Sequence, residues 1–243
     1  MERTSIRSFL GNGHSFHLYK YGKVEGIPKG VEVKDAKSIM DEGDMRKYKG
    51  KKDYATFSDI FRYKLLLEKG GIWVDTDIIC LRPFDFNGEH VFASERVERQ
   101  SKWEVRLPSR PVGCVIKSPK GSEMMSYCLE KSKEKSFDKI KWAEVGPDLL
   151  TKAVKKFEMQ ESVFPPWKFC PIPWWKWENL SETSVRIRII EGIKRSVLKP
   201  YSYHLWHSKW GSDGKGKNDI YPQNTIYGSL QNEFLEDLKR QKI

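Results

Sequence analysis

The sequence predicts an α/β fold in which a mixed central sheet is flanked by helices. Short apolar segments with the alternation of strands recur between longer segments with helical spacing, an order typical of α/β domains. No internal repeat or linker interrupts the 243 residues, so we expect one domain over residues 1–243. With 38% hydrophobic and 32% charged residues, the composition is that of a globular protein with a substantial core.

The first elements are short. A helix is predicted over Arg3–Leu10, where glycines follow, and a strand over Ser15–Tyr19, where apolar and polar side chains alternate. A second strand is predicted at Gly30–Val33, and Asp35 is placed to cap the N-terminus of a short helical turn. The charged segment 41–53 contains glycines and predicts a loop.

The clearest helix runs from Ala55 to Lys69, because its apolar residues recur at helical spacing. Gly70-Gly71 follows at once and is a natural helix end, since glycine tolerates the left-handed conformation. An apolar strand then leads into Asp75, and a second apolar run spans Ile78–Leu81. The sequence therefore predicts a helix, a glycine turn and two strands in close succession.

The second half of the chain continues the alternation of strands and helices. The expected elements, in chain order, are strands at Val91–Ser94 and Cys114–Lys117, helices at Ser122–Lys133 and Pro147–Phe157, a Pro- and Trp-rich loop at Phe164–Trp177, a loop at His204–Trp210, and a final helix at Gln223–Lys239.

The charge of the chain is strongly positive, with 44 Lys and Arg against 33 Asp and Glu and a net charge of +11. Such a surface attracts anionic partners, although an ordinary solvated surface is an equal alternative. No nucleic-acid recognition motif accompanies the charge, so we expect no nucleic-acid partner.

The cysteines and the N-terminal residues indicate the cellular compartment in which the protein is expected. The four cysteines are widely spaced, without a Cys-x-x-Cys pair, which suits buried thiols in a reducing compartment. No apolar run of about 18 residues occurs, and the first residues lack an apolar leader. We therefore expect a cytoplasmic protein, with contact to the inner membrane surface left open.

Asp75-Thr76-Asp77 is the most informative motif. Side chains alternate in an extended segment, so both carboxylates are expected to point to the same side. Two like charges that converge are costly unless a cation or a proton separates them. Oxygen ligands of this kind suit Mg²⁺ or Mn²⁺.

The motif and its surroundings resemble a known family. Ser58–Tyr63, followed by Leu65-Leu66 and Gly70–Asp77, is similar to the sugar-binding region of the DXD-motif glycosyltransferases of family 32. That family includes outer-chain mannosyltransferases and enzymes of capsule synthesis, and its distant relatives are the clostridial glucosylating toxins. Residues 8–19, Val115–Gly121 and the late element His204-Leu205-Trp206 also resemble the family.

The resemblance implies a GT-A-type fold, a UDP- or GDP-sugar donor, Mn²⁺ or Mg²⁺, and transfer with retention of anomeric configuration. It also implies a glycan, lipid-linked saccharide or glycoprotein acceptor. Two departures stand out. The family's usual first strand, which lines the nucleotide base, is not found before Arg3, and Val112-Gly113 stands where many relatives carry Asn.

The resemblance also implies roles for individual residues. Asp77 would ligate the metal directly, Asp75 would act through water or the ribose, and His204 would be a further ligand, with His207 as a weaker alternative. Asp59 and Arg62 would contact donor-sugar hydroxyls. Spacing alone favours a simple ion pair between these two residues within one helix.

Other residues are expected around the donor. They are Tyr54, Ser58 and Gly71 beside the nucleotide sugar, and Trp206 and Trp210 as a lid that excludes water. No pair of glutamates is clearly placed as nucleophile and acid, so we expect front-face transfer, in which the departing phosphate helps deprotonate the acceptor. The alternative function is a non-catalytic nucleotide-sugar-binding protein of the same fold.

Overall fold

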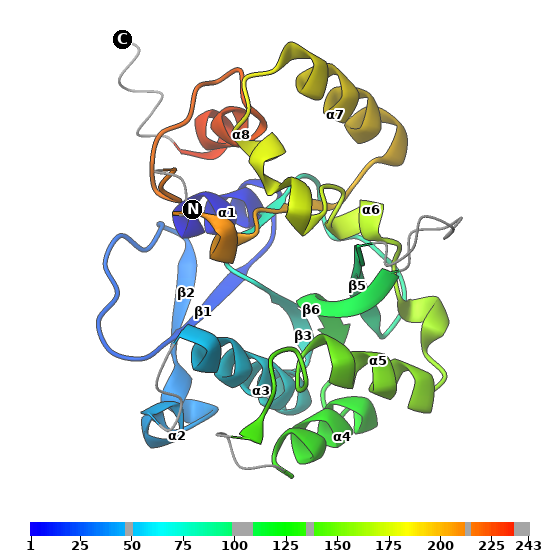
Figure 1. Ribbon diagram of the computed structural model, residues 1–243. Coiled ribbons are helices and arrows are strands. Elements are labelled where there is room, and N and C mark those ends of the chain that lie inside the picture. Colours follow the sequence, from blue (N-terminus) through cyan, green and yellow to red (C-terminus); the bar gives the residue numbers. More distant parts are fainter. Residues whose placement is uncertain (47–50, 99–108, 135–138, 212–214, 236–243) are drawn as a thin grey trace.

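The computed structural model describes residues 1–46, 51–98, 109–134, 139–211 and 215–235 (Figure 1). Helices and strands alternate along the chain, and helices lie on both sides of the central sheet, so the expected α/β class is confirmed. The α-helices are α1 (Glu2–Gly11), α2 (Glu42–Arg46), α3 (Lys51–Lys69), α4 (Glu123–Ser132), α5 (Pro147–Lys156), α6 (Pro166–Phe169), α7 (Val185–Leu198) and α8 (Ile226–Phe234). The strands are β1 (Phe16–Lys20), β2 (Val31–Asp35), β3 (Gly71–Val74), β4 (Ile78–Cys80), β5 (Val91–Arg96), β6 (Ser109–Ser118) and β7 (Ser202–His204).

The central sheet has the order β3-β6-β5, and β6 pairs antiparallel with both neighbours. Two further pairs stand apart from it: β1 and β2 are parallel, and β4 and β7 are antiparallel. Parallel and antiparallel pairings therefore occur in separate small sheets, not within the single mixed sheet that we expected. The single-domain organisation stays a prediction.

The core consists of two apolar clusters on the two sides of the central sheet. Side chains alternate across a strand, so Phe92 packs into one cluster whereas Val91 and Ala93 pack into the other. The Phe92 cluster is completed by residues of α3, α4 and α5, such as Tyr63. The other cluster is completed by residues of α1, α6 and α8 and of the β4–β7 pair, and Figure 1 shows these helices on the opposite side of the sheet from α3–α5.

Two glycines make the turn from α3 into β3, as predicted. Gly70 and Gly71 have φ angles of +67° and +98°, in the region that other residues rarely adopt. A Cβ atom on Gly70 would also lie 2.5 Å from the backbone nitrogen of Lys120. The turn allows β3 to run back along the cleft side of α3 and to deliver Asp75 beside that helix.

Most expected elements are confirmed within a few residues, including the Asp35 cap, whose side chain accepts a hydrogen bond from Lys37 N–H. The expected loop 41–53 is wrong in part, because it contains α2 and the first residues of α3. β6 begins earlier than predicted, at Ser109, because its outer half pairs with β5. Helix α7 was not predicted.

The final helix is shorter than expected, over Ile226–Phe234, and residues 236–239 of the prediction lie outside the described residues. The Pro- and Trp-rich segment, for which no helix was predicted, forms α6 and a 3-10 helix, η4 (Trp174–Leu180). Among the described helices, none combines the length and the apolar character needed to cross a membrane.

Candidate functional site

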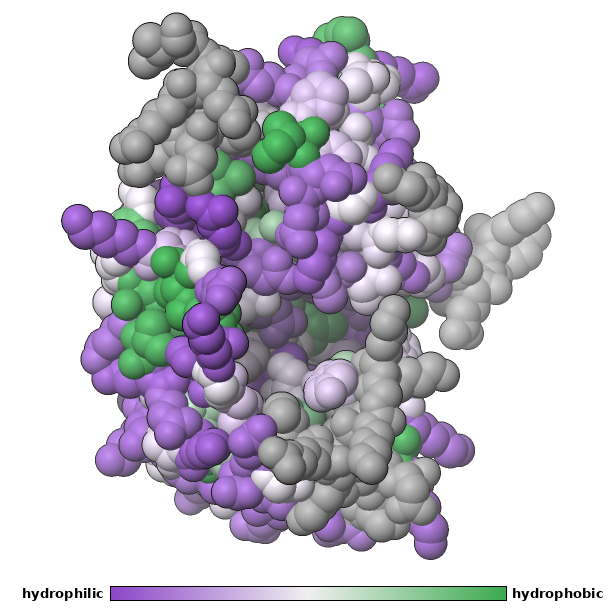
Figure 2. Space-filling model, turned by 90° about the vertical axis from the view of Figure 1, so that its left-hand side faces the viewer, coloured by the Kyte–Doolittle hydropathy of each residue, from purple (hydrophilic) through white to green (hydrophobic). Residues whose placement is uncertain are grey.

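A cleft of about 1580 Å³ lies along β1, α3, β3 and the loop after β7. Its lining includes eight of the ten expected site residues: Ser58, Asp59, Arg62, Gly71, Asp75, Asp77, His204 and Trp206. Figure 2 shows the side of the molecule next to β1 and β2, which is largely hydrophilic and is hollowed near its middle. Residues far apart in the sequence therefore meet in one large depression of the surface, as a binding site requires.

The Asp75–Asp77 segment forms a tight turn between β3 and β4. Ile78 N–H donates a hydrogen bond to the Asp75 carbonyl oxygen at 3.0 Å, which closes the turn, and Asp75 N–H donates to the Cys114 carbonyl oxygen at 2.9 Å. The expectation of an extended segment is therefore wrong here. The carboxylates still converge, because ligand atoms of Asp75, Asp77 and His204 all lie within 4.8 Å of one another.

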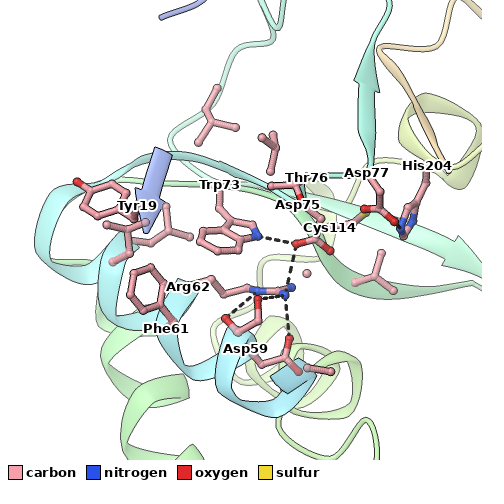
Figure 3. A pocket seen from close by; sticks show the side chains of 18 of the residues that line it. Tyr19, Asp59, Phe61, Arg62, Trp73, Asp75, Thr76, Asp77, Cys114 and His204 are labelled. Carbon is pink, nitrogen blue, oxygen red and sulfur yellow. Dashed lines mark hydrogen bonds and ion pairs between the residues drawn. The ribbon is translucent and has the colours of Figure 1, made fainter. Parts of the chain in front are cut away.

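Strand β7 brings His204 to Asp77. Strands β4 and β7 pair so that Ile78 lies opposite His204, and Leu205 N–H donates to the Asp77 carbonyl oxygen at 2.9 Å. Asp77 Oδ2 accepts a hydrogen bond from His207 N–H at 2.8 Å and lies 3.3 Å from His204 Nε2. Figure 3 shows the two side chains facing each other in the pocket.

The opposite charges of Asp77 and His204 stabilise each other. Burial by itself raises the pKa of Asp77, but His204 and the His207 N–H outweigh it and lower that pKa to about 2. Burial lowers the pKa of His204, and Asp77 outweighs it, so the pKa of the imidazole is raised well above its ordinary value. Without a metal, the pair is therefore a carboxylate and an imidazolium.

The chemistry of the donor set fits a divalent metal ion. Two carboxylates and one imidazole nitrogen converge, and hard oxygen ligands are those that Mg²⁺ and Mn²⁺ prefer. A metal at this place would take over the role of the His204 proton, since an imidazole must be neutral to bind a cation. His207 contributes its backbone N–H to Asp77, while its ring lies 2.8 Å from Lys217 Nζ.

The other nitrogen of His204 faces two thiols. Nδ1 lies 3.8 Å from Cys170 Sγ, which in turn lies 3.6 Å from Cys114 Sγ. All four cysteines are buried and free, as expected. The two thiols therefore flank Nδ1 and leave Nε2 as the nitrogen that faces the carboxylates.

Arg62 organises the second half of the site. Its NH2 atom lies 3.2 Å from Asp59 Oδ1 and 3.4 Å from Asp75 Oδ1, and its Nε donates to the Ser58 carbonyl oxygen at 3.4 Å (Figure 3). Trp73 Nε1 donates to the same Asp75 oxygen at 2.8 Å. The expected alternative, an ion pair within one helix, is thus only part of the arrangement, because Arg62 also bridges α3 to the turn.

Burial governs the ionisation of this group. It raises the pKa of Asp59 to about 6, despite the opposing charge of Arg62, and the nearby Asp75 raises it further. Burial disfavours the Arg62 charge, but Asp75 and Asp59 more than compensate, so the pKa of the guanidinium is raised. Arg62 is therefore a permanent cation, whereas Asp59 changes charge near neutral pH.

Two glycines make room for this cluster. A Cβ atom on Gly113 of β6 would lie 1.7 Å from Arg62 NH1, and one on Gly146 would lie 2.6 Å from Asp59 Oδ2. Neither glycine has a positive φ angle, and close approach is a reason for glycine at both positions.

The aromatic residues expected at the donor site fall into different places. Trp206 lines the cleft and stacks on His204, with ring centroids 3.8 Å apart. Trp210 is not among the lining residues, because it packs against Trp177 and Tyr227 and donates from Nε1 to the Leu205 carbonyl oxygen. Trp210 therefore supports the loop from behind and does not line the cleft in this structure, so its role as a lid stays a prediction.

The remaining expected residues also differ in position. Ser58 lines the cleft, and its hydroxyl lies 3.3 Å from Arg62 NH2. Gly71 lines the cleft at the start of β3. Tyr54 is 55% exposed and is not among the lining residues, although the next residue, Ala55, lines the cleft.

Sequence reasoning missed an ion pair in the cleft wall. Arg110 of β6 lies 2.9 Å from Glu95 of β5 through NH2, and it also reaches Asp148 at 3.5 Å. Glu95 and Arg110 both line the cleft. Glu95 directly follows the strand predicted at Val91–Ser94, but nothing near Arg110 in the sequence indicates its partner, because the strand register alone places the two residues opposite each other.

Family models identify both halves of the chain as related to glycosyltransferases. Residues 14–98 match the model "Glycosyltransferase sugar-binding region containing DXD motif". Residues 117–234 match the "Alpha 1,4-glycosyltransferase conserved region". Each match covers less than half of the chain. The first contains Asp59, Arg62, Asp75 and Asp77, and the second contains His204.

Curated relatives point the same way. The chain is 28% identical over 163 residues to human lactosylceramide 4-alpha-galactosyltransferase, which is 63% of this chain and 41% of that protein. Over the same length it is 28% identical to the Pongo pygmaeus protein of that name, covering 67% of it. It is 24% identical to human alpha-1,4-N-acetylglucosaminyltransferase over 71% of this chain and 48% of that protein. The chain spans less than half the length of either human relative.

Among solved structures, the chain resembles "PaToxG Glycosyltransferase" with a TM-score of 0.43 and 15% identity, over 95% of this chain and 79% of that chain.

Proposed function

We propose that the protein is a metal-dependent glycosyltransferase that moves a sugar from a nucleotide-sugar donor to a hydroxyl of a saccharide acceptor. The observation that carries this proposal is the convergence of Asp75, Asp77 and His204 within 4.8 Å, in a cleft that also holds the Asp59–Arg62 pair. The matches to models of DXD-containing and alpha-1,4-glycosyltransferases support it.

Asp75, Asp77 and His204 would hold Mn²⁺ or Mg²⁺. The metal, when bound, supplies a Lewis acid that stabilises the negative charge of the departing nucleoside diphosphate. The protein's part is to hold the ligands in place: Asp77 is fixed by the His207 N–H and Asp75 by the Trp73 indole. Pre-positioned ligands need little rearrangement when the metal and the donor arrive.

Arg62 and Asp59 would position the donor sugar. The guanidinium keeps its charge and is held by two carboxylates, so its remaining N–H groups have a fixed direction. Asp59 offers carboxylate oxygens as acceptors for sugar hydroxyls. Fixed donors and acceptors around the transferred sugar orient its anomeric carbon toward the acceptor.

The transfer would retain the anomeric configuration by front-face attack. The bond from the acceptor oxygen to the anomeric carbon forms as the bond to phosphate breaks, and the acceptor proton passes to the departing phosphate oxygen. Glu95 does not suit a nucleophile, because Arg110 pairs with it. Proton NMR of the first-formed product tests this step, and an inverted configuration would contradict it.

For the donor and the acceptor, we propose classes of compound and not single compounds. UDP- and GDP-sugars both suit the cleft, and the acceptor would be a glycan, a lipid-linked saccharide or a glycoprotein. The relatives named for lactosylceramide favour the lipid-linked class and an alpha linkage. The outer-chain mannosyltransferase and capsule-synthesis types stay predictions.

The second candidate is a non-catalytic protein that binds a nucleotide sugar in the same cleft without transferring the sugar. A panel of nucleotide sugars with Mn²⁺ decides between the two functions, with binding followed by calorimetry and nucleoside diphosphate release followed over time. Release above the blank supports the enzyme. Tight binding without release, with any saccharide acceptor, supports the alternative.

A further inference from the structure

Helix α7 exposes an apolar face. Figure 1 shows the helix at the end of the molecule opposite α4. Five β-branched aliphatic side chains of this 14-residue helix are between 41% and 71% exposed: Val185, Ile189, Ile190, Ile193 and Val197. Four of them are spaced by four residues, so they form one stripe along the helix.

The side of α7 that faces the protein is mixed, because the half-buried Ile187 and Leu198 lie on the same side as the buried Glu191. Glu191 is the buried residue of the helix, at 5% exposure, and Lys194 Nζ donates to its carboxylate at 2.6 Å. The Leu198 carbonyl oxygen accepts a hydrogen bond from Lys168 Nζ at 3.3 Å. A helix on a globular protein normally turns most of its apolar side chains inward, whereas the five aliphatic side chains named above are exposed. Scattered exposed aliphatics are ordinary, but a continuous stripe of this kind marks an interaction surface.

The charges around the stripe are positive. The helix and its C-cap carry five basic residues, Arg186, Arg188, Lys194, Arg195 and Lys199, against the single acid Glu191, which is buried. Four of the five are exposed. The stripe is therefore bordered by cations on a chain whose net charge is +11.

We propose that α7 docks the protein on an anionic lipid bilayer. The helix lies in the plane of the interface, with the aliphatic stripe among the upper acyl chains and the basic residues at the headgroups. Fourteen residues reach about 21 Å, too short to cross a bilayer, which suits a helix lying on its surface. A second copy of the chain fits less well, since two such helices face to face would bring their cations together.

A short segment of chain connects the docking helix to the cleft wall. The chain passes from η4, whose Trp174 lines the cleft, directly through residues 181–184 into α7. A lipid-linked acceptor would then be presented from the surface to which the protein is bound. This consequence rests on the proposed function, whereas the docking itself does not.

Vesicle flotation of the full chain tests the proposal. Vesicles of phosphatidylcholine alone are compared with vesicles that contain phosphatidylserine, at low and physiological salt. We expect binding to the anionic vesicles, weakened by salt. The triple variant Ile189→Gln, Ile193→Gln, Val197→Gln should lose at least about tenfold in affinity, and Arg188→Gln and Arg195→Gln about fivefold each.

The matched control is the triple variant Val24→Gln, Val33→Gln, Ile220→Gln, which removes three exposed aliphatics outside α7. It should float like the wild type. Unchanged melting temperatures of both triple variants show that neither is merely unfolded. Asp77→Asn should also float normally, so loss of transfer and loss of docking are separate results.

The proposal is overturned if the wild-type chain does not float with anionic vesicles at low salt. Equal losses in the α7 variant and in the control would overturn it as well. A third result would also overturn it: the wild type sediments as a dimer, and the α7 triple variant sediments as a monomer but floats with vesicles as the wild type does.

Discussion

The two halves of the site solve the same electrostatic problem with different cations. At one end, Asp77 faces His204, whose positive charge depends on a proton. At the other, Asp59 and Asp75 share Arg62, whose charge is permanent. An imidazolium proton can be exchanged for a metal ion, whereas a guanidinium cannot be removed. The His204 end is therefore suited to bind and release a cation, and the Arg62 end to hold a fixed geometry.

The substitution Asp77→Asn tests the His204 end of the site and has the largest expected effect. It removes a charged ligand from the exchangeable end, so Mn²⁺ affinity and transfer should each fall by more than about a hundredfold. Calorimetric Mn²⁺ titration and product formation measure the two effects. Asp85→Asn, at an exposed position outside the cleft, is the control. Wild-type Mn²⁺ affinity in Asp77→Asn would remove the metal from this end of the site.

Arg62→Lys tests the fixed end. Lysine keeps the charge but loses the planar fork that reaches Asp59, Asp75 and the Ser58 carbonyl. We expect donor affinity to fall by about tenfold to a hundredfold, with Mn²⁺ affinity within about threefold of the wild type. Parallel titrations of donor and Mn²⁺ separate the two. An equal loss of both affinities would mean that the two halves do not act independently.

The pH dependence of Mn²⁺ binding sharpens the contrast further. The pKa of His204 is raised, so below that pKa a proton competes with the metal, and affinity should fall by up to about tenfold per pH unit as the pH decreases. His204→Gln should flatten this slope, although its affinity is lower throughout. Arg62→Lys should leave the slope unchanged, and a change there would argue against His204 as the competing group.

The same pair affects the stability of the metal-free protein. Because the folded pKa of His204 is raised, its contribution is complete below the unfolded pKa and is lost as the pH rises through the folded value. The contribution of Asp77, whose pKa is lowered to about 2, is lost as the pH falls from about 4 toward 2. Urea unfolding in the presence of a chelator should therefore show an additional free energy of unfolding at pH values between the folded pKa values of Asp77 and His204. The substitution His204→Gln should remove the decline of this free energy at alkaline pH.

The smallest expected effect comes from Gly113→Ala. The new Cβ atom would overlap Arg62 NH1, so Arg62 must move, which should cost about 1–3 kcal/mol of unfolding free energy. Donor affinity should fall by a few-fold, in the same direction as in Arg62→Lys. Gly192→Ala in α7 is the control, because a Cβ atom there meets nothing within 4 Å. If Gly113→Ala is as stable as the wild type, close packing is not the reason for that glycine.

Local features of the site could be predicted from the sequence. The Ala55–Lys69 periodicity, the glycine pair and the apolar run before Asp75 are short-range patterns, and each gave the correct element. Asp35 as a helix cap was correct for the same reason. The cysteines could be read as buried thiols from their spacing.

Long-range features could not be predicted in this way. Arg110 meets Glu95 only through the pairing of β5 with β6, and Trp210 turns into the core although its neighbour Trp206 lines the cleft. Helix α7 escaped prediction because its β-branched residues and its exposed aliphatic stripe do not follow the pattern of a helix packed on a core.

The sequence by itself determined the chemical groups of the site: the carboxylates of Asp75 and Asp77, the Asp59–Arg62 spacing on one helix, and the imidazole of His204. Only the tertiary structure decided how they meet. The turn at Asp75–Asp77 brings together carboxylates that an extended strand was expected to align, and β7 carries His204 to Asp77. The physical reason is that side-chain type is local, whereas convergence of charges depends on strand register, turns and the space left by glycines such as Gly113.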